Sequence, residues 1–410
     1  MDSEGLLRKQ RCLIVIFFII GLVMPVVGLQ SSYQNISSYG TVNYSPFLGK
    51  GVNYLSLYHM YSSKYTTDDI LRRDFSRFQQ DGINVISLSL YWYRLEGNTR
   101  GDYDGEYKPY PEEIGGPYGK RFLDDIKRVI QIAHEYEIKV LIAFNTLWGE
   151  NDSPWCTPDY VIDPVTGKNI GLAVVRSQDM KQAFIDMVNR TVRYLAGTPG
   201  IWAWAILNEP WYWGRAPNEH DFITNNGKTQ KENFIDLIQE LASIAKTYDG
   251  RPVTVKFCST SQWTGTNGVQ HLKNIFVDDW GWNQKIFDTL DFISFNDYIS
   301  QFPELTDMWQ NITATNVNGS NLFDKKVWIT EFGFDSSDEN TQALFFNKSI
   351  QFYETLPVDL ISAWYWESDN NTPGTFGFGG SDMNICADAE TGNPRTSYNE
   401  LIKFDPKPQL

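Results

Sequence analysis

Histidine and cysteine are scarce in this chain, with only four of each among 410 residues. The histidines are scattered, and no group of histidines and cysteines has the spacing of metal ligands, so we expect no metal site. No glycine-rich phosphate loop of the GxGxxG or P-loop type follows any apolar run. The sequence therefore predicts neither a nucleotide nor any other cofactor.

Positive charge is also in deficit. The chain has 35 Lys and Arg residues against 50 Asp and Glu residues, which gives a net charge of -15. Binding to nucleic acid requires a basic face, so we expect no nucleic-acid partner. An acidic surface is instead typical of a soluble protein that acts on neutral ligands.

Long apolar runs are missing after the N-terminal region. There, basic residues between positions 8 and 11 precede the apolar segment 12–24, and small residues follow up to Gly28. This pattern predicts a secretory signal peptide over residues 1–28 and hence an extracellular protein. An uncleaved anchor is the alternative, because the segment 12–29 reaches the lower limit of a membrane span, and only then would we expect membrane contact. Asn-x-Ser/Thr sequons, such as those at Asn35 and Asn43, add weak support for export.

Removal of the signal peptide would leave an odd number of cysteines, Cys156, Cys258 and Cys386. An exported chain with three cysteines forms at most one internal bridge and keeps one free thiol. Cys156 and Cys386 both fall in irregular stretches, which favours them as the pair.

The rest of the chain divides into a polar N-terminal tail, residues 29–46, and a larger domain, residues 47–410. In this domain short apolar runs alternate with helical segments that have apolar residues at three- and four-residue spacing. Such alternation indicates an α/β fold, and without a nucleotide motif a closed (β/α)8 TIM barrel fits better than an open sheet. The eight expected strands are Lys50–Tyr54, Asn84–Leu90, Ile138–Asn145, Trp202–Leu207, Pro252–Phe257, Phe292–Phe295, Val327–Thr330 and Leu360–Trp366.

Two glutamates stand where a barrel carries its functional groups, just after the C-terminal ends of strands. Glu209 follows the apolar run that ends at Leu207, and Glu331 follows the run that ends at Thr330. An acidic side chain at the end of a buried strand has no packing purpose. Cleavage of a glycosidic bond needs such a pair, one carboxyl group protonated and the other ionised, because the transition state resembles an oxocarbenium ion. Retention of configuration further requires the two carboxyl groups to lie about 5 Å apart.

The segments around both glutamates resemble known motifs. Asn208-Glu209-Pro210 and Thr330-Glu331-Phe332-Gly333 are similar to the acid/base and nucleophile motifs of clan A glycoside hydrolases, most closely the family 5 cellulase and mannanase group. By spacing, the resemblance extends from about residue 49 to residue 404. It implies that Glu209 is the acid/base, that Glu331 is the nucleophile, and that Asn208 binds the 2-hydroxyl group of the sugar in the −1 subsite.

Two further positions follow from the same resemblance. The segment 291–298 resembles the sixth-strand motif, which implies that Tyr298 hydrogen-bonds the nucleophile. The segment 360–367 resembles the eighth strand, which supplies a tryptophan under the −1 sugar, and Trp366 is preferred over Trp364 for this role.

The chain departs from the family at three strand ends. Ser87 stands where the family has an arginine on the second strand, and Asn145 and Asn296 stand where histidines are common on the third and sixth strands. We expect both asparagines to contact the substrate, as part of a divergent member of the family or a neighbouring family of the clan.

Aromatic residues are abundant after the predicted strands, and aromatic rings stack on the faces of sugar rings. Although a single tryptophan more often fills a core, we expect a group of them to line a polysaccharide cleft: Trp148, Trp211, Trp213 and Trp263. The sequence thus predicts a retaining endo-β-glycanase that cleaves β-1,4-linked glucan or mannan by double displacement. An exo-acting β-glycosidase or a transglycosylase is the alternative within the clan, and a non-catalytic carbohydrate-binding barrel is the alternative outside enzymes.

Overall fold

The computed structural model describes most of the predicted catalytic domain. The described residues are 49–54, 67–92, 95, 117–145, 157–158, 160–210, 224, 226–258, 284–298, 316–317, 320–321, 324–334, 338–366, 386–388 and 393–404. The predicted signal peptide and tail lie outside them, so their cleavage and the export of the protein stay predictions. Among the described helices, none combines the length and the apolar character that crossing a membrane requires.

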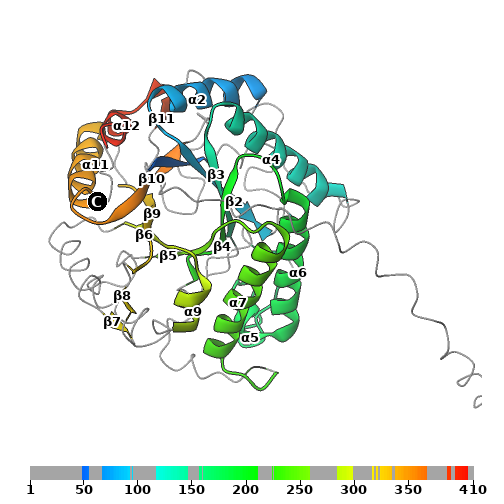
Figure 1. Ribbon diagram of the computed structural model, residues 1–410. Coiled ribbons are helices and arrows are strands. Elements are labelled where there is room, and N and C mark those ends of the chain that lie inside the picture. The colour runs from blue at the N-terminus through cyan, green and yellow to red at the C-terminus, as the bar shows by residue number, and fades with distance from the viewer. Residues whose placement is uncertain are drawn as a thin grey trace, which may run out of the picture. The chain divides into compact units, whose positions relative to one another are not determined.

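Eight parallel strands close into a barrel in the order β1-β10-β9-β6-β5-β4-β3-β2, with helices around the outside (Figure 1). This confirms the (β/α)8 fold expected from the sequence. Each expected strand is present, with small differences at its ends: β1 Gly49–Tyr54, β2 Val85–Tyr91, β3 Lys139–Asn145, β4 Ile201–Asn208, β5 Val253–Cys258, β6 Ile293–Asp297, β9 Val327–Phe332 and β10 Val358–Trp366.

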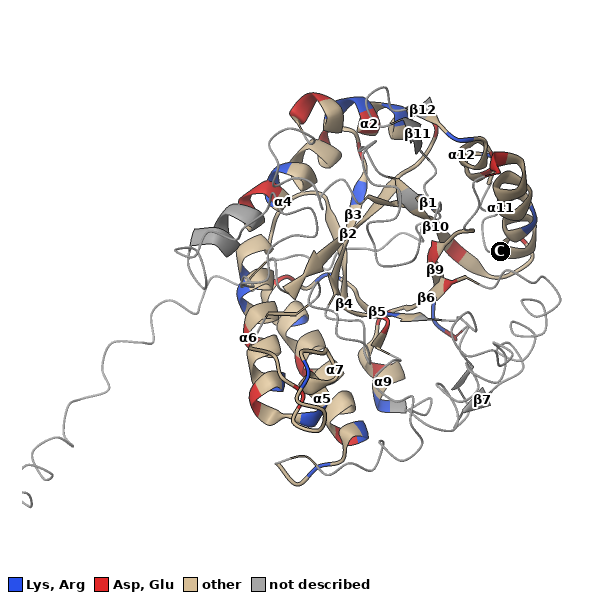
Figure 2. Ribbon diagram, turned by 180° about the vertical axis from the view of Figure 1, so that it is seen from behind, with Lys and Arg blue, Asp and Glu red and all other residues tan. Residues whose placement is uncertain are grey.

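The helices cover the outer face of the barrel, and Figure 2 shows charged residues of both signs along them. Their bounds are α2 Asp68–Gln80, α4 Pro117–Glu135, α5 Ala173–Arg176, α6 Gln178–Leu195, α7 Gln230–Tyr248, α9 Gln284–Thr289, α11 Glu339–Tyr353 and α12 Thr396–Leu401. Two short antiparallel pairs join β7 Asn316–Val317 to β8 Ser320–Asn321 and β11 Cys386–Asp388 to β12 Asn393–Pro394. The expected Cys156–Cys386 bridge stays a prediction, because Cys156 lies outside the described residues.

Helix α2 illustrates how local sequence builds this outer layer. The Thr67 side chain accepts a hydrogen bond from the backbone N–H of Ile70 and so caps the helix. Two aspartates in the first turn interact favourably with the positive end of the helix dipole. Leu71, Phe75 and Phe78 recur at helical spacing and are fully buried against the barrel. Burial of each large apolar side chain contributes about 2 kcal/mol, which outweighs the propensity terms of a single helix.

The barrel interior is layered. Its lower layer is apolar and contains Phe292, Trp328 and Leu360, with the rings of Trp328 and Phe292 3.8 Å apart between centroids. Above it, toward the C-terminal ends of the strands, the inward side chains become polar. The hydroxyl groups of Thr254 and Ser294 donate hydrogen bonds to neighbouring backbone carbonyl groups. Polar groups inside a barrel must be hydrogen-bonded to offset the loss of water, and such a layer can carry the charged groups of a site above it.

Candidate active site

Strands β4 and β9 each contain one residue more than their neighbours just before their C-terminal ends. Between two paired positions on β5, Thr254 and Lys256, strand β4 passes from Ala205 to Asn208, three steps against two. Strand β9 likewise passes from Ile329 to Glu331 while β6 advances by a single residue, Phe295 to Asn296. Because side chains alternate along a strand, one extra residue reverses the face on which the following side chains lie.

The consequence is that polar side chains face inward where simple alternation would turn them outward. On β9, Trp328 and Thr330 face the barrel interior, so alternation alone would turn Glu331 toward the helices. Instead the side chains of both Thr330 and Glu331 form hydrogen bonds at the mouth of the barrel. On β4 the extra residue places Asn208 level with Lys256 of the next strand.

Glu209, which follows β4 directly, adopts a left-handed backbone conformation with φ of 49°. Residues other than glycine rarely adopt this conformation, which costs on the order of 1 kcal/mol and is concentrated at functional sites. A hydrogen bond of 2.8 Å from the backbone N–H of Glu209 to the carbonyl group of Lys256 maintains it. The residue is 9% exposed, so it is largely enclosed but not fully buried.

Asn296 on β6 connects the two glutamates. Its Oδ1 accepts a hydrogen bond of 3.0 Å from the hydroxyl group of Thr330, the residue before Glu331. On the other side of the amide, Nδ2 donates to Glu209 Oε1 at 2.9 Å and to Asn208 Oδ1 at 3.2 Å. The structure thus brings Asn208, Glu209 and Asn296 together, and Asn296 positions the carboxyl group of Glu209.

Glu331 is 3% exposed, and each of its carboxylate oxygens has a donor. The hydroxyl group of Tyr298 donates to Oε2 at 2.6 Å, the contact that the family resemblance implied for this tyrosine. The ammonium group of Lys256, on β5, donates to Oε1 in a buried ion pair. A charged donor on one oxygen and a neutral donor on the other hold the carboxylate group in a single orientation.

Sequence reasoning missed Lys256. The signal was present, because a lysine stands in the apolar strand Val253–Cys258 at the same parity as the inward-facing Thr254. A lysine is rarely fully buried unless it is paired, so its presence there required an anion across the barrel. Glu331 on β9, two strands away around the barrel, supplies that anion.

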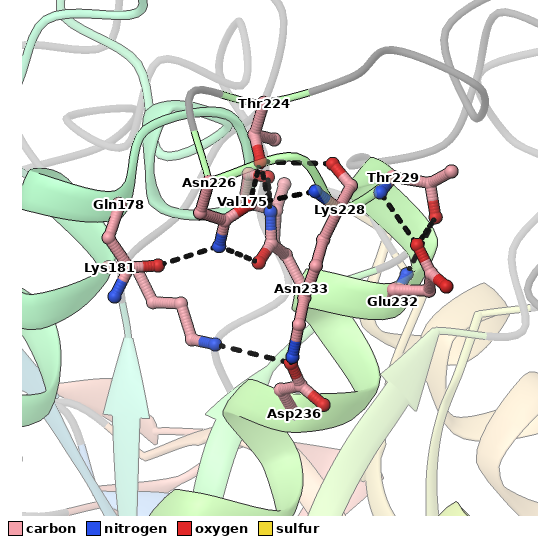
Figure 3. Close-up of polar contacts among 10 residues, drawn as sticks. All are labelled: Val175, Gln178, Lys181, Thr224, Asn226, Lys228, Thr229, Glu232, Asn233 and Asp236. Carbon is pink, nitrogen blue, oxygen red and sulfur yellow. Dashed lines mark hydrogen bonds and ion pairs between the residues drawn. The ribbon is translucent and has the colours of Figure 1, made fainter.

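A network of hydrogen bonds joins residues that precede α7 to the connection between β3 and β4 (Figure 3). Asn233, near the start of α7, donates to Thr224 at 2.8 Å, and Asn226 donates both to Asn233 and to Gln178 on α6 at 2.9 Å. Thr229 and Glu232 form a capping box at the first turn of α7. This network ties the connections that follow β3 and β4 to each other at the same end of the barrel.

Trp366 is not a sugar-stacking residue, so the prediction for it is wrong. Between Val52 and Tyr54 of β1, strand β10 advances by three residues, from Ala363 to Trp366, and the extra residue turns the indole ring outward. There it is fully buried, lies 5.0 Å from Phe78 between ring centroids, and donates to the Asp74 carboxylate at 3.2 Å. An enclosed ring cannot stack on a substrate.

Trp364 lies on the other face of β10. It follows the inward-facing Leu360 and Ser362 at two-residue intervals, and it is partly exposed. Gly333 allows this arrangement, because a Cβ atom at Gly333 would lie 2.8 Å from the carbonyl oxygen of Trp364. The tryptophan of β10 at the mouth of the barrel is therefore Trp364, which the sequence-based choice had set aside.

We expect Trp366→Phe to affect stability and not substrate binding. Loss of the indole N–H leaves the buried Asp74 carboxyl group, whose pKa burial already raises, without one of its donors, and the smaller ring leaves a gap. The free energy of unfolding should fall by about 2 kcal/mol, measured by urea denaturation, while KM stays unchanged. Trp364→Ala serves as the matched variant and should raise KM. A raised KM for Trp366→Phe with unchanged stability would contradict this assignment.

The remaining predicted contacts have different outcomes. Asn145 ends β3, opposite Tyr91 of β2, and is 3% exposed. Trp148, Trp211, Trp213 and Trp263 lie outside the described residues, so their place in a cleft stays a prediction. In the part of the chain that the structure describes, no group of three or more His, Cys, Asp or Glu residues could hold a metal ion.

Comparison with solved structures places this barrel beside glycoside hydrolases. A GH5_18 protein from Streptomyces cattleya, in complex with Manb1-4GlcNAc, matches 87% of this chain and 79% of its own with a TM-score of 0.60 and 12% identity. The barrel is shared with family 5 glycoside hydrolases.

Two further solved structures that match this barrel are named as enzymes that act on mannosides. The endo-beta-1,4-mannanase from Thermotoga petrophila covers 87% of this chain and 76% of its own at a TM-score of 0.58 and 16% identity. The exo-beta-1,4-mannosidase from Opitutaceae bacterium strain TAV5 matches 87% of this chain and 59% of its own, with a TM-score of 0.59 and 12% identity. No family model and no curated protein sequence matches the chain. At such low identity the likeness establishes the fold, and the reaction must be argued from the site.

Proposed function

We propose that this protein is a retaining glycoside hydrolase that cleaves β-1,4-linked mannan or glucan. The observation that carries the proposal is the connection of two enclosed glutamates at the C-terminal ends of β4 and β9 through one amide: Asn296 donates to Glu209 and accepts from the residue before Glu331. Nothing in the packing of a barrel calls for two acidic side chains at its mouth, whereas glycosidic cleavage does.

The two glutamates have different surroundings, which supports different roles. Glu331 faces the Lys256 ammonium group and therefore suits the ionised nucleophile, which attacks the anomeric carbon. Glu209 accepts a hydrogen bond from the neutral amide of Asn296, and we assign to it the protonation of the leaving oxygen and the later removal of a proton from water. At its start, double displacement needs an ionised nucleophile and a protonated acid.

Asn208 and Trp364 complete the −1 subsite in this proposal. Because Asn208 Oδ1 accepts from Asn296, the amide N–H groups of Asn208 are left to donate to a substrate, and the 2-hydroxyl group of the sugar is the partner that the family resemblance implies. Trp364 offers the aromatic surface under the sugar ring. The mannose-linked names of the structural neighbours favour β-1,4-mannan over glucan as the first substrate to test.

The test is digestion of a panel of soluble β-mannans and β-glucans, with sizing of the products and proton NMR of the first products formed. We expect a β-1,4-linked substrate to be cleaved and the newly formed reducing ends to appear first as the β anomer, because two displacements retain configuration. Internal cleavage would yield oligosaccharides of mixed length, whereas an exo-acting enzyme would release one sugar size.

The outcomes separate the candidate functions. First appearance of the α anomer would exclude double displacement. Binding of oligosaccharides without any cleavage would instead identify a carbohydrate-binding barrel. As a matched control, the exposed Glu240 on α7 can be changed to Gln, which should leave all rates unchanged.

A further inference from the structure

We propose that Lys256 is a positioning residue that speeds the second half of the reaction, the breakdown of the glycosyl-enzyme. This inference rests on the proposed function and assigns a role to a side chain from a strand, β5, that had no expected part in catalysis. It follows from where the ammonium group lies and from how the charge of its partner changes during the reaction.

The first step in the argument is the burial of Lys256. The side chain is fully enclosed, with no exposed surface, at the centre of the barrel. Within the described residues, Glu331 is the one carboxylate that pairs with it. A buried ammonium group is costly without an anion, so the energy of this lysine depends strongly on the charge of Glu331.

The second step is that the ammonium group is held in place. Asn53 on β1 donates from Nδ2 to the carbonyl groups of Thr330 and Ala363 at 2.8 and 3.2 Å. These contacts fix the amide, so Oδ1 faces Lys256 Nζ at 3.3 Å. Because an amide oxygen is neutral, Asn53 orients the ammonium group without replacing the charge of Glu331 when that charge is lost.

The third step concerns the source of the cation. The position on β2 at which the resembled family has an arginine is Ser87, which is buried and whose Oγ has no hydrogen-bond partner among the described residues. Ser87 therefore provides no positive charge, and Lys256 provides it from β5. The backbone carbonyl group of Lys256 also receives the N–H of Glu209, so a substitution of its side chain leaves that contact in place.

The charge of Glu331 changes in opposite directions in the two chemical steps. In the first, a carboxylate oxygen bonds to the anomeric carbon, the leaving group departs with a proton from Glu209, and the carboxylate becomes a neutral ester. Lys256 is then left against a group without charge. In the second, a water oxygen bonds to the anomeric carbon, its proton passes to Glu209, and the electron pair of the breaking ester bond returns to Glu331. Lys256 stabilises this returning charge, so it favours the second step over the first.

The inference is tested by trapping the intermediate with 2-deoxy-2-fluoro-β-mannosyl and β-glucosyl fluorides, removing excess reagent, and following the recovery of activity. We expect the activity of Lys256→Met to recover at least about tenfold more slowly than that of the unaltered protein, while the rate of labelling falls much less. A merely structural role would lower the fraction of active protein but would not change the recovery rate of the molecules that were labelled.

A matched control and a second variant complete the test. Lys246→Met removes a lysine from an exposed ion pair with Asp291 and should recover at the unaltered rate. Lys256→Gln keeps a hydrogen-bond donor but no charge, and its recovery should also be slow. It replaces Lys256→Met in the test if that variant does not fold. Equal recovery rates for the Lys256 variants and the unaltered protein would overturn the inference alone. Absence of labelling at Glu331 in the unaltered protein, with both reagents, would overturn the proposed function and the inference with it.

Discussion

Glu331→Ala is expected to lower kcat by about 10⁴-fold or more on the substrate that the panel identifies, because no other group replaces a covalent nucleophile. The small side chain also leaves space beside the anomeric carbon. Added azide should enter that space and, with Glu209 still able to protonate the leaving group, yield the α-glycosyl azide from a β-glycoside. The anomer of this product, determined by NMR, identifies the face from which Glu331 attacks.

Stability must be measured on the same variant, because Glu331→Ala leaves the Lys256 ammonium group buried without its anion. Removal of one partner of a buried ion pair costs about 3–5 kcal/mol. The double variant Glu331→Ala with Lys256→Met should regain part of that loss but none of the activity. Activity retained by Glu331→Ala in a folded protein would show that this glutamate is not the nucleophile.

Glu209→Ala is expected to lower kcat by about 10²- to 10⁴-fold on natural glycosides, the usual contribution of a general acid and base. Its effect should depend on the leaving group. A 2,4-dinitrophenyl glycoside needs no protonation to depart, so its glycosylation should remain fast and the glycosyl-enzyme on Glu331 should accumulate as a burst of dinitrophenol. Azide should then restore turnover and yield the β-glycosyl azide, the opposite anomer to that from Glu331→Ala.

The opposite products make the two assignments testable against each other. If both variants gave the same anomer, or if Glu209→Ala lost activity equally on natural and activated glycosides, the division of roles between the two glutamates would be wrong. Mutation of Glu209 should cost less stability than mutation of Glu331, since Asn296, which donates to its carboxyl group, is a neutral amide that also contacts Thr330 and Asn208.

The sequence was a good guide wherever a pattern repeats along the chain. Apolar runs of strand length, separated by helical periodicity, predicted all eight barrel strands, and the end of each strand indicated where Glu209 and Glu331 would lie. Tyr298 was placed correctly by motif resemblance, and its hydroxyl group contacts Glu331. These predictions needed only local information, since a buried strand and the residue that follows it can be recognised within one short segment.

Sequence reasoning failed where one strand shifts against another. Alternation places Trp364 and Trp366 on the same face of β10, so choosing between them from sequence was arbitrary. The extra residue between Ala363 and Trp366 separates them and sends Trp366 into the helix layer. A register shift depends on the pairing of residues hundreds of positions apart, such as Tyr54 with Trp366, and it has no signature within either strand.

What the sequence determined by itself is the succession of strands and helices, the closure of these elements into a barrel, and the two acidic residues at strand ends. Only the tertiary structure decided that Glu331 turns inward and that Lys256 is its counter-ion. The physical reason is that the buried charge of Lys256 on β5 requires an anion nearby, and Glu331 on β9 supplies it. The two side chains meet only when the barrel closes and the extra residue on β9 turns the carboxylate group inward.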